Sequence, residues 1–314
     1  MNPSTSSAAP LKVLVVGATG ALGRPVVQGL LAKGVSVRAV SRHPEQAADL
    51  GALGAEVVAA DLTDRESLER ACAGVQRVFT AAHGFLGRGR WRSEAVDIDG
   101  HRTLFEVARQ AGVQRVVHTS ALGSTEAMPV DFFRHKAAAE AVLKASGLDH
   151  VILRPTAFME HHAHNFNGKA VLDTGKAKLI GPGTKPRNFV CAADVAQFAL
   201  RALLEDPPPF RELDIGGPGH YSNAEVAALY ARAAGIAPRA GHLPRGVAKF
   251  LSVAARPLHP GLARVMHIFS LPDDAYSERF DGAAALSERY GIRLRTMEEF
   301  VGQQVALARS TAKG

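Results

Sequence analysis

Three glycines near the start of the chain are spaced so that the backbone could hold a phosphate group. Gly17, Gly20 and Gly23 follow an apolar run at residues 12–18 and precede a segment with helical spacing. In such a strand–turn–helix context, the first glycine permits a tight turn, the second a close approach of a pyrophosphate, and the third close packing of the helix. The helix N-terminus then presents free N–H groups and a favourable dipole. We therefore predict a dinucleotide-binding turn, completed by Thr19, Ala21 and Leu22; the alternative is a purely structural turn.

The end of the second apolar run indicates which dinucleotide is bound. Where an acidic residue would bind the ribose hydroxyls of NAD, the chain has Ser41 and Arg42. A guanidinium suits a 2′-phosphate, so we expect NADP(H) to be preferred, with NAD(H) possible; alternatively, Arg42 stacks on adenine or lies in solvent. Asp61, ahead of Leu62, is placed to accept from the adenine amino group or to cap the following turn. The loop at residues 87–91 is expected to order over the cofactor phosphates or to stay solvated.

The elements that position these residues alternate between strands and helices. Apolar runs recur at residues 12–18, 36–42, 55–61, 77–82, 115–121 and 150–156. Continuous rather than alternating hydrophobicity indicates strands covered on both faces, as in a parallel sheet. The segments between these runs have the apolar spacing of helices, at residues 24–33, 64–73, 94–111 and 131–146. A predicted capping box at Thr63 and Glu66 marks the start of the second segment. The pattern predicts a Rossmann-type, doubly wound α/β fold.

Beyond residue 157 the strict alternation ends. Residues 175–190 indicate a hairpin or a pair of short strands, and helices are expected at 193–205, 223–234 and 297–308. Capping boxes at Ser222 with Glu225, and at Thr296 with Glu299, precede the last two. We predict a disordered tail at residues 1–10 and a dinucleotide-binding domain at 11–157, to which 193–206 return. A smaller, interleaved substrate-binding subdomain comprises 158–192 and 207–314.

Composition excludes several classes of protein. The 314 residues are 46% hydrophobic and 21% charged, without an apolar run long enough to cross a bilayer. Cys72 and Cys191 lie far apart, which excludes a disulfide scaffold or a structural zinc site and favours a reducing cytoplasm. The net charge is +7, and six cations with no acidic residue lie between Glu225 and Asp273. A localised excess is not typical of nucleic-acid binding, so no nucleic-acid partner is expected.

Several motifs together resemble a known family. The stretches GATGALG (17–23), AADLTD (59–64), HTSA (118–121), HKAAAE (135–140) and ILRPTAFME (152–160) occur in order. The chain thus resembles the short-chain dehydrogenase/reductase superfamily, and more narrowly its atypical NmrA-like, NAD(P)-binding branch, over roughly residues 12–235. The resemblance implies that Ser120 orients a substrate carbonyl and that Lys136 binds the nicotinamide ribose. It also implies cofactor contacts by Ala81, Ala82, His83, Thr119, Lys136, Pro155, Thr156, Ala157 and Phe158.

One position departs from the superfamily pattern. Where a Tyr-x-x-x-Lys motif supplies the proton-donating hydroxyl, this chain has Phe132. A positioned acid contributes about 10²–10⁴-fold in rate, so the proton must come from Lys136 itself, from a water that it holds, or from His83 or His135. Alternatively, the protein binds cofactor without turnover, as do the redox-sensing regulators of the family, which bind NADP and a partner protein.

Histidines cluster immediately after the last motif. Glu160, His161, His162 and His164 lack the spacing of a zincin site, so no metal is predicted. We expect His161 and His162, together with Phe132, to line the substrate pocket; the alternative is an ordinary helix surface.

A basic, amphipathic helix is expected to begin at Pro244 and to be stopped by Pro257. Arg245, Lys249 and Arg256 fall on one side of the helical wheel, whereas Val247, Phe250, Leu251 and Ala254 fall on the other. Such a helix could cap the substrate cleft with its charges in water, or make weak peripheral contact with anionic lipid to collect a lipophilic substrate.

These observations together predict an NAD(P)H-dependent reductase. Hydride would pass to a ketone, imine or quinone-like group of a small, apolar, natural-product-type substrate. The alternative is a catalytically silent NADP sensor that acts through a partner protein. An epimerase or dehydratase of nucleotide sugars is disfavoured, because those members also depend on the missing tyrosine.

Overall fold

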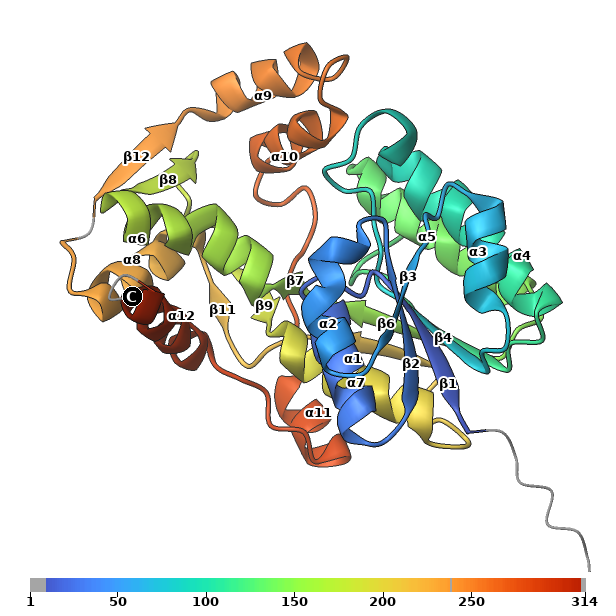
Figure 1. Ribbon diagram of the computed structural model, residues 1–314. Helices are drawn as coiled ribbons and strands as arrows, with labels where there is room; N and C mark the ends of the chain where they lie inside the picture. Colours follow the sequence, from blue (N-terminus) through green and yellow to red (C-terminus); the bar gives the residue numbers. More distant parts are fainter. Residues whose placement is uncertain (1–9, 238, 312–314) are drawn as a thin grey trace, which may run out of the picture.

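The computed structural model describes residues 10–237 and 239–311, and a parallel sheet forms its centre (Figure 1). Within these residues the sheet has seven strands in the order β10-β6-β5-β4-β1-β2-β3, and all neighbouring pairs are parallel. The strands are β1 (Lys12–Val16), β2 (Ser36–Ser41), β3 (Glu56–Ala59), β4 (Arg77–Thr80), β5 (Arg115–Thr119), β6 (His150–Pro155) and β10 (Glu212–Ile215). The predicted Rossmann-type α/β class is confirmed, and the strand order reverses between β1 and β4, where such folds bind ligands.

Helices cover both faces of this sheet, which explains the uninterrupted apolar runs. Val13 and Val15 pack toward one helical layer, whereas Leu14 and Val16 pack toward the other. The first layer contains α1 (Gly23–Ala32), α2 (Ala48–Ala52), α7 (Ala192–Leu204) and α11 (Ala283–Tyr290). The second contains α3 (Arg65–Cys72), α4 (His101–Gln110) and α5 (Asp131–Ala145). Helix α7 packs against α1, although the 159 residues from Lys33 to Cys191 lie between the two helices in the sequence.

Local differences from the predicted elements have identifiable causes. Helix α3 is capped by Asp64, which accepts from the Ser67 N–H at 3.4 Å, so the predicted capping box is wrong. The hydroxyl of Thr63 instead donates to Asp61 at 3.0 Å. The helix expected at 94–111 begins as a π-helical segment, η3 (Glu94–Gly100), before α4. The other two predicted capping boxes form.

After β6, apart from α7, β10 and α11, the chain forms a second group of helices and short strands (Figure 1). They are β7 (Ala157–Phe158), the π-helical η4 (Met159–Gly168), α6 (Lys169–Thr174), β8 (Ala177–Ile180), β9 (Arg187–Val190), β11 (His220–Tyr221), α8 (Asn223–Ala234), β12 (Ala240–Leu243), α9 (Arg245–Ala254), α10 (Pro260–Ser270) and α12 (Met297–Thr311). Strands β8 and β9 do not form a hairpin, because β8 pairs with β12 and β9 pairs with β7 and β11. The predicted tail, apart from Pro10, lies outside the described residues. None of the helices described here has the length and apolarity required to cross a membrane.

Candidate active site

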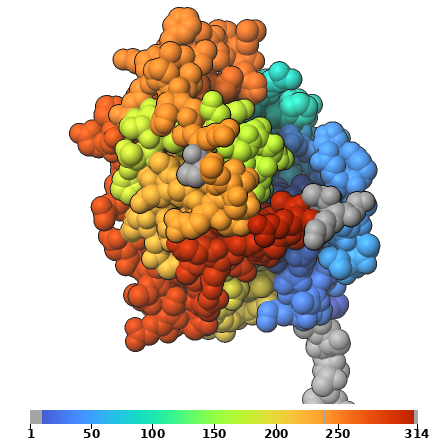
Figure 2. All heavy atoms as spheres, turned by 90° about the vertical axis from the view of Figure 1, so that its left-hand side faces the viewer, coloured from blue at the N-terminus to red at the C-terminus, as the bar shows by residue number. Residues whose placement is uncertain are grey.

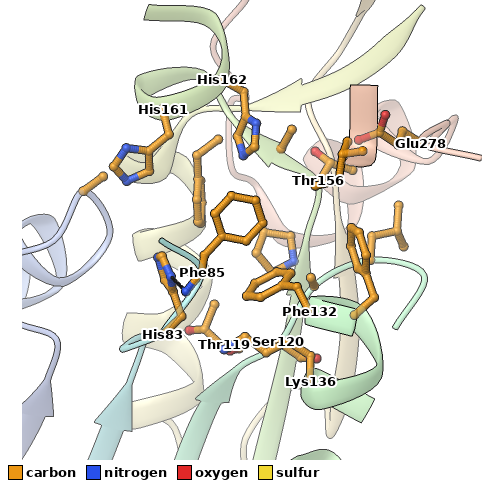
Figure 3. A pocket seen from close by; sticks show the side chains of 18 of the residues that line it. His83, Phe85, Thr119, Ser120, Phe132, Lys136, Thr156, His161, His162 and Glu278 are labelled. Carbon is orange, nitrogen blue, oxygen red and sulfur yellow. Dashed lines mark hydrogen bonds between the residues drawn. The ribbon is translucent and has the colours of Figure 1, made fainter. Parts of the chain in front are cut away.

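A cavity of about 440 Å³ opens where β1, β4, β5 and β6 end. It extends from the glycine turn to α10, and Figure 3 shows its side chains: Thr119, Ser120 and Lys136 lie along one side, with His161 and His162 opposite. Seventeen predicted residues line it, namely Gly17, Gly20, Ala21, Leu22, Gly23, Ala81, His83, Thr119, Ser120, Phe132, Lys136, Pro155, Thr156, Ala157, Phe158, His161 and His162. Thr19, Ser41, Arg42, Asp61, Leu62 and Ala82 are not part of this lining.

The glycine turn has the geometry that a diphosphate requires. Gly17 has a φ of +86°, and a Cβ on Gly23 would lie 2.0 Å from the Gly17 carbonyl oxygen. The N-cap of α1 is Leu22, whose side chain cannot accept a hydrogen bond. The Arg24 N–H donates to the Gly20 carbonyl at 3.1 Å and Pro25 has no N–H, so the start of the helix offers an anion the N–H groups of Leu22 and Gly23. The residues present therefore fit the phosphates of a dinucleotide.

A polar cluster surrounds Asp61 at the other end of the predicted dinucleotide site. The guanidinium groups of Arg42 and Arg90 lie 5.4 and 5.3 Å from the ring centre of Trp91. The indole N–H donates to Asp61 at 2.7 Å, and the Thr63 N–H donates to the same carboxylate at 2.9 Å. Partial burial opposes the charge of Asp61, but these hydrogen bonds lower its pKa. Asp61 thus caps the turn that follows it, and the loop at residues 87–91 lies against this cluster.

Lys136 belongs to a buried ion pair that the sequence motifs did not indicate. Only 3% of its side chain is exposed, and its Nζ lies 3.3 Å from Asp97 Oδ1 and donates to the Thr119 carbonyl at 3.2 Å. The other oxygen of Asp97 accepts from the Gly84 N–H at 3.0 Å and from the Ser93 hydroxyl at 2.7 Å. Ser93 Oγ in turn lies 2.9 Å from Nδ1 of the half-buried His135. A chain of polar contacts therefore connects Lys136 with a surface histidine.

The surroundings determine the charge states in this part of the cavity. Burial opposes ionisation of Asp97, yet the Lys136 charge and the Ser93 hydrogen bond hold its pKa below the usual value. Desolvation and the Lys136 cation lower the pKa of His83 to about 4, so its ring is neutral at pH 7. Because His83 Nδ1 accepts from the Phe85 N–H at 3.3 Å, its proton is placed on Nε2.

Two buried hydroxyls beside Lys136 have no partner within the described part of the chain. These are Thr119 Oγ1 and Ser120 Oγ, and both residues line the cavity. The ring of Phe132 stands nearby, with its centre 5.7 Å from Lys136 Nζ and 4.9 Å from the ring centre of Phe85. The site therefore offers hydrogen-bonding groups on one side and an aromatic wall on the other.

The side chains of the histidine segment point to different partners. Glu160 accepts from the Ala192 N–H at 3.0 Å, and His164 contacts the Tyr230 hydroxyl at 3.0 Å. His161 lies 3.3 Å from the Asn165 side chain, while His162 packs against Phe166. Among residues 10–237 and 239–311, no group of three or more His, Cys, Asp and Glu side chains could hold a metal ion.

Several residues of the site were missed by sequence reasoning. For Asp97 a signal existed, because Asp97 and His101 lie four residues apart on the face of the helical segment that buries Leu104 and Phe105. Tyr276 and the ion pair of Arg187 with Glu278, at 2.8 Å, also line the cavity. These come from segments about 90 residues apart, so no local pattern could bring them together.

Comparison with known proteins identifies the family. Residues 17–206 match the family model described as NAD(P)H-binding. Sterol demethylase protein B of Methylococcus capsulatus is 35% identical over 218 residues, which cover 62% of this chain and 66% of that protein, just under two thirds of its length. An NAD(P)H azoreductase of Xenophilus azovorans is 27% identical over 71% of this chain and 74% of its own length.

The fold agrees with a solved structure of a similar enzyme. The NADPH-dependent quinone oxidoreductase of Escherichia coli, determined with NADPH, has a TM-score of 0.71 and 24% identity, covering 93% of this chain and 99% of the other. These comparisons confirm the predicted NAD(P)H-binding class and its cofactor at the level of the family, and the solved structure confirms the Rossmann-type fold. The family model spans the glycine turn, the strands from β2 to β6 and the returning helix α7, which is more than half of the chain, so the chain belongs to the NAD(P)H-binding family.

Proposed function

We propose that the protein is an NADPH-dependent reductase that transfers hydride to a conjugated, quinone-like group of an apolar, natural-product-type substrate; ketones and imines are the other acceptors considered. One observation carries the proposal: the glycine turn, the Lys136 ammonium and the unpartnered Ser120 hydroxyl open onto one cavity whose wall is largely apolar and includes Phe85 and Phe132. Residues 158–192 and 207–314 would supply the substrate side of this cavity.

The chain's own residues would orient the acceptor and supply its proton. Bound NADPH provides the hydride. Ser120 Oγ would donate a hydrogen bond to the acceptor oxygen, and Lys136 Nζ would give up the proton that completes the reduction. Asp97 and Ser93 connect this ammonium with His135, so a proton from solvent could restore it. Phe85 and Phe132 would pack on the substrate and exclude water.

Conjugated acceptors suit a site without a tyrosine hydroxyl. When hydride reaches a quinone or an enone, the negative charge is delocalised, so the product needs less assistance from an acid than the alkoxide formed from an aliphatic ketone. Two similar proteins, a quinone oxidoreductase and an azoreductase, are named after conjugated acceptors. The name of a third similar protein, sterol demethylase protein B, refers to a sterol. We extend this preference for conjugated or apolar substrates to the present chain.

Oxidation of NADPH by a panel of acceptors tests the proposal. We expect turnover of a benzoquinone or naphthoquinone to exceed that of a matched aliphatic ketone by about 10²-fold or more, since the alkoxide formed from the ketone depends more strongly on a positioned acid than the delocalised quinone product does. Equal rates for both acceptors would contradict the proposed acceptor class. Tight NADPH binding with no consumption above background would instead favour the cofactor-sensing alternative, in which a partner protein reads the redox state.

We further propose that Arg42 selects NADPH. Replacing Arg42 with glutamate should lower the ratio of kcat/KM for NADPH to that for NADH by about 10- to 100-fold, because a charge-assisted hydrogen bond to the 2′-phosphate is worth about 1.5–3 kcal/mol. Steady-state kinetics with both cofactors measures the ratio. Arg109→Gln, a substitution of an exposed arginine near the end of α4, serves as the control. An unchanged ratio in Arg42→Glu would show that this arginine stacks on the base or lies in solvent.

The expected cytoplasmic location and a role in secondary metabolism stay predictions. They rest on the scarcity of cysteine and on the apolar cavity, respectively.

A further inference from the structure

Helix α9 has its large apolar side chains on the outside. Ala248 is fully buried against α10, whereas Phe250 is 69% and Val253 71% exposed. Ala248 therefore packs with Val265 and Met266 of α10, whereas the large apolar side chains of α9, which were expected to cover the cleft, are exposed. We call the segment from α9 through α10, residues 245–270, the α9–α10 arm; it forms the top of the molecule in Figures 1 and 2.

The exposed apolar surface continues from α9 to the start of α10 and to the loop that touches it. Leu258 is 82%, Leu262 45% and Leu86 53% exposed. Val247 and Leu251 extend the same face of α9. Soluble monomers rarely expose so many large apolar side chains in one region without an interaction partner.

Positive charge accompanies this surface. Lys249 and Arg256 are exposed and form no ion pair with any described residue, and no acidic residue occurs from 226 to 272. The other two cations of the arm are neutralised, because Arg245 pairs with Asp273 and Arg264 pairs with Asp131. The free charges thus lie beside the exposed apolar stripe.

The arm is fixed to the rim of the cavity. Arg264 donates two hydrogen bonds to Asp131, at 2.6 and 2.9 Å, and a Cβ on Gly261 would lie 2.5 Å from Leu86 Cα. Val265, Ile268 and Phe269 of α10 line the cavity, as does Leu86. The exposed apolar surface and the cavity therefore adjoin one another.

From this arrangement we propose that the α9–α10 arm docks the protein on an anionic lipid surface, with Phe250, Val253 and Leu258 inserted among the lipids and Lys249 and Arg256 at the headgroups. Apolar insertion combined with cations is the chemistry of an interfacial helix. A second copy docked through the same face would bring like charges together, which disfavours it. The idea that docking delivers a lipophilic substrate to the cavity rests on the proposed reductase function. Binding of the protein to lipid, in contrast, can be measured without any catalytic assay.

Co-sedimentation of the full chain with vesicles tests the proposal. We expect binding to vesicles of phosphatidylcholine mixed with phosphatidylglycerol, and much weaker binding to phosphatidylcholine alone. The triple variant Phe250→Ser/Val253→Ser/Leu258→Ser and the double variant Lys249→Gln/Arg256→Gln should each weaken binding about tenfold or more. The control Lys33→Gln/Leu53→Ser removes an exposed cation and an exposed leucine far from the arm and should bind as the wild type does.

Correct folding of every variant is checked by NADPH binding and thermal unfolding. No binding to anionic vesicles, or equal binding to both vesicle types, would overturn the proposal. The proposal would also be overturned if sedimentation velocity detected a dimer of the wild type, and if the triple variant were monomeric but still bound the vesicles. Loss of quinone reduction with intact vesicle binding would overturn only the proposed reductase function.

Discussion

Lys136→Met is expected to lower kcat for quinone reduction by about 10²–10⁴-fold at saturating NADPH. The substitution removes the only ammonium group placed at the floor of the cavity among the described residues, and Phe132 has no proton to offer in its place. Stopped-flow and steady-state assays of NADPH oxidation measure the loss. Lys144→Met, on the exposed side of the same helix, should retain the wild-type rate.

An undiminished rate in Lys136→Met would assign the proton to another donor. His83 Nε2 or a water molecule in the cavity would then be the next candidates. The rate should be measured only at temperatures where the variant is fully folded, because the same lysine also affects stability.

The same substitution should destabilise the fold by about 3–5 kcal/mol, since it leaves Asp97, which is 0% exposed, without its cation. The double variant Asp97→Asn/Lys136→Met should recover much of this loss, because a neutral amide replaces the uncompensated charge. Urea unfolding of the two single variants, the double variant and the wild type gives the coupling free energy. Lys169→Met, which breaks an exposed pair with Asp173, should cost only about 0.3–0.5 kcal/mol.

The sign of the pH dependence follows from the direction of the pKa shift. Burial disfavours the charged form of Asp97, but Lys136 and Ser93 hold its pKa below 3.8 in the folded protein. The contribution of Asp97 to the free energy of unfolding is therefore present above the pKa that this carboxyl has in the unfolded chain. It is lost as the pH falls through the lower pKa that the carboxyl has in the folded protein. If Lys136→Met and Asp97→Asn/Lys136→Met lowered the free energy of unfolding at pH 7 by the same amount, the ion pair would contribute through packing alone.

The central sheet could be predicted from the sequence because its signals are local. The inner strands β1 and β5 are buried on both faces, so their apolar runs are continuous. The glycine turn was equally accessible, since Gly17 and Gly23 meet within seven residues of chain. Both features need no information about distant segments.

The rest of the site depends on contacts between distant segments. The partner of Lys136 is Asp97, 39 positions earlier, and it was overlooked because the segment was interpreted as an ordinary helix. The expected orientation of α9, with its apolar face over the cleft, is wrong. The periodicity of the sequence identifies an apolar face of a helix but does not indicate which surface that face contacts. Ala248, rather than Phe250, packs against Val265 and Met266 of α10.

The position of Trp91 has a practical consequence. This indole is the single tryptophan of the chain; two guanidinium groups lie near its ring, and its N–H donates to Asp61. Its emission spectrum therefore samples one small region of the molecule. The predicted adenosine end of the cofactor site therefore has its own fluorescent reporter, and no dye or second chromophore has to be attached.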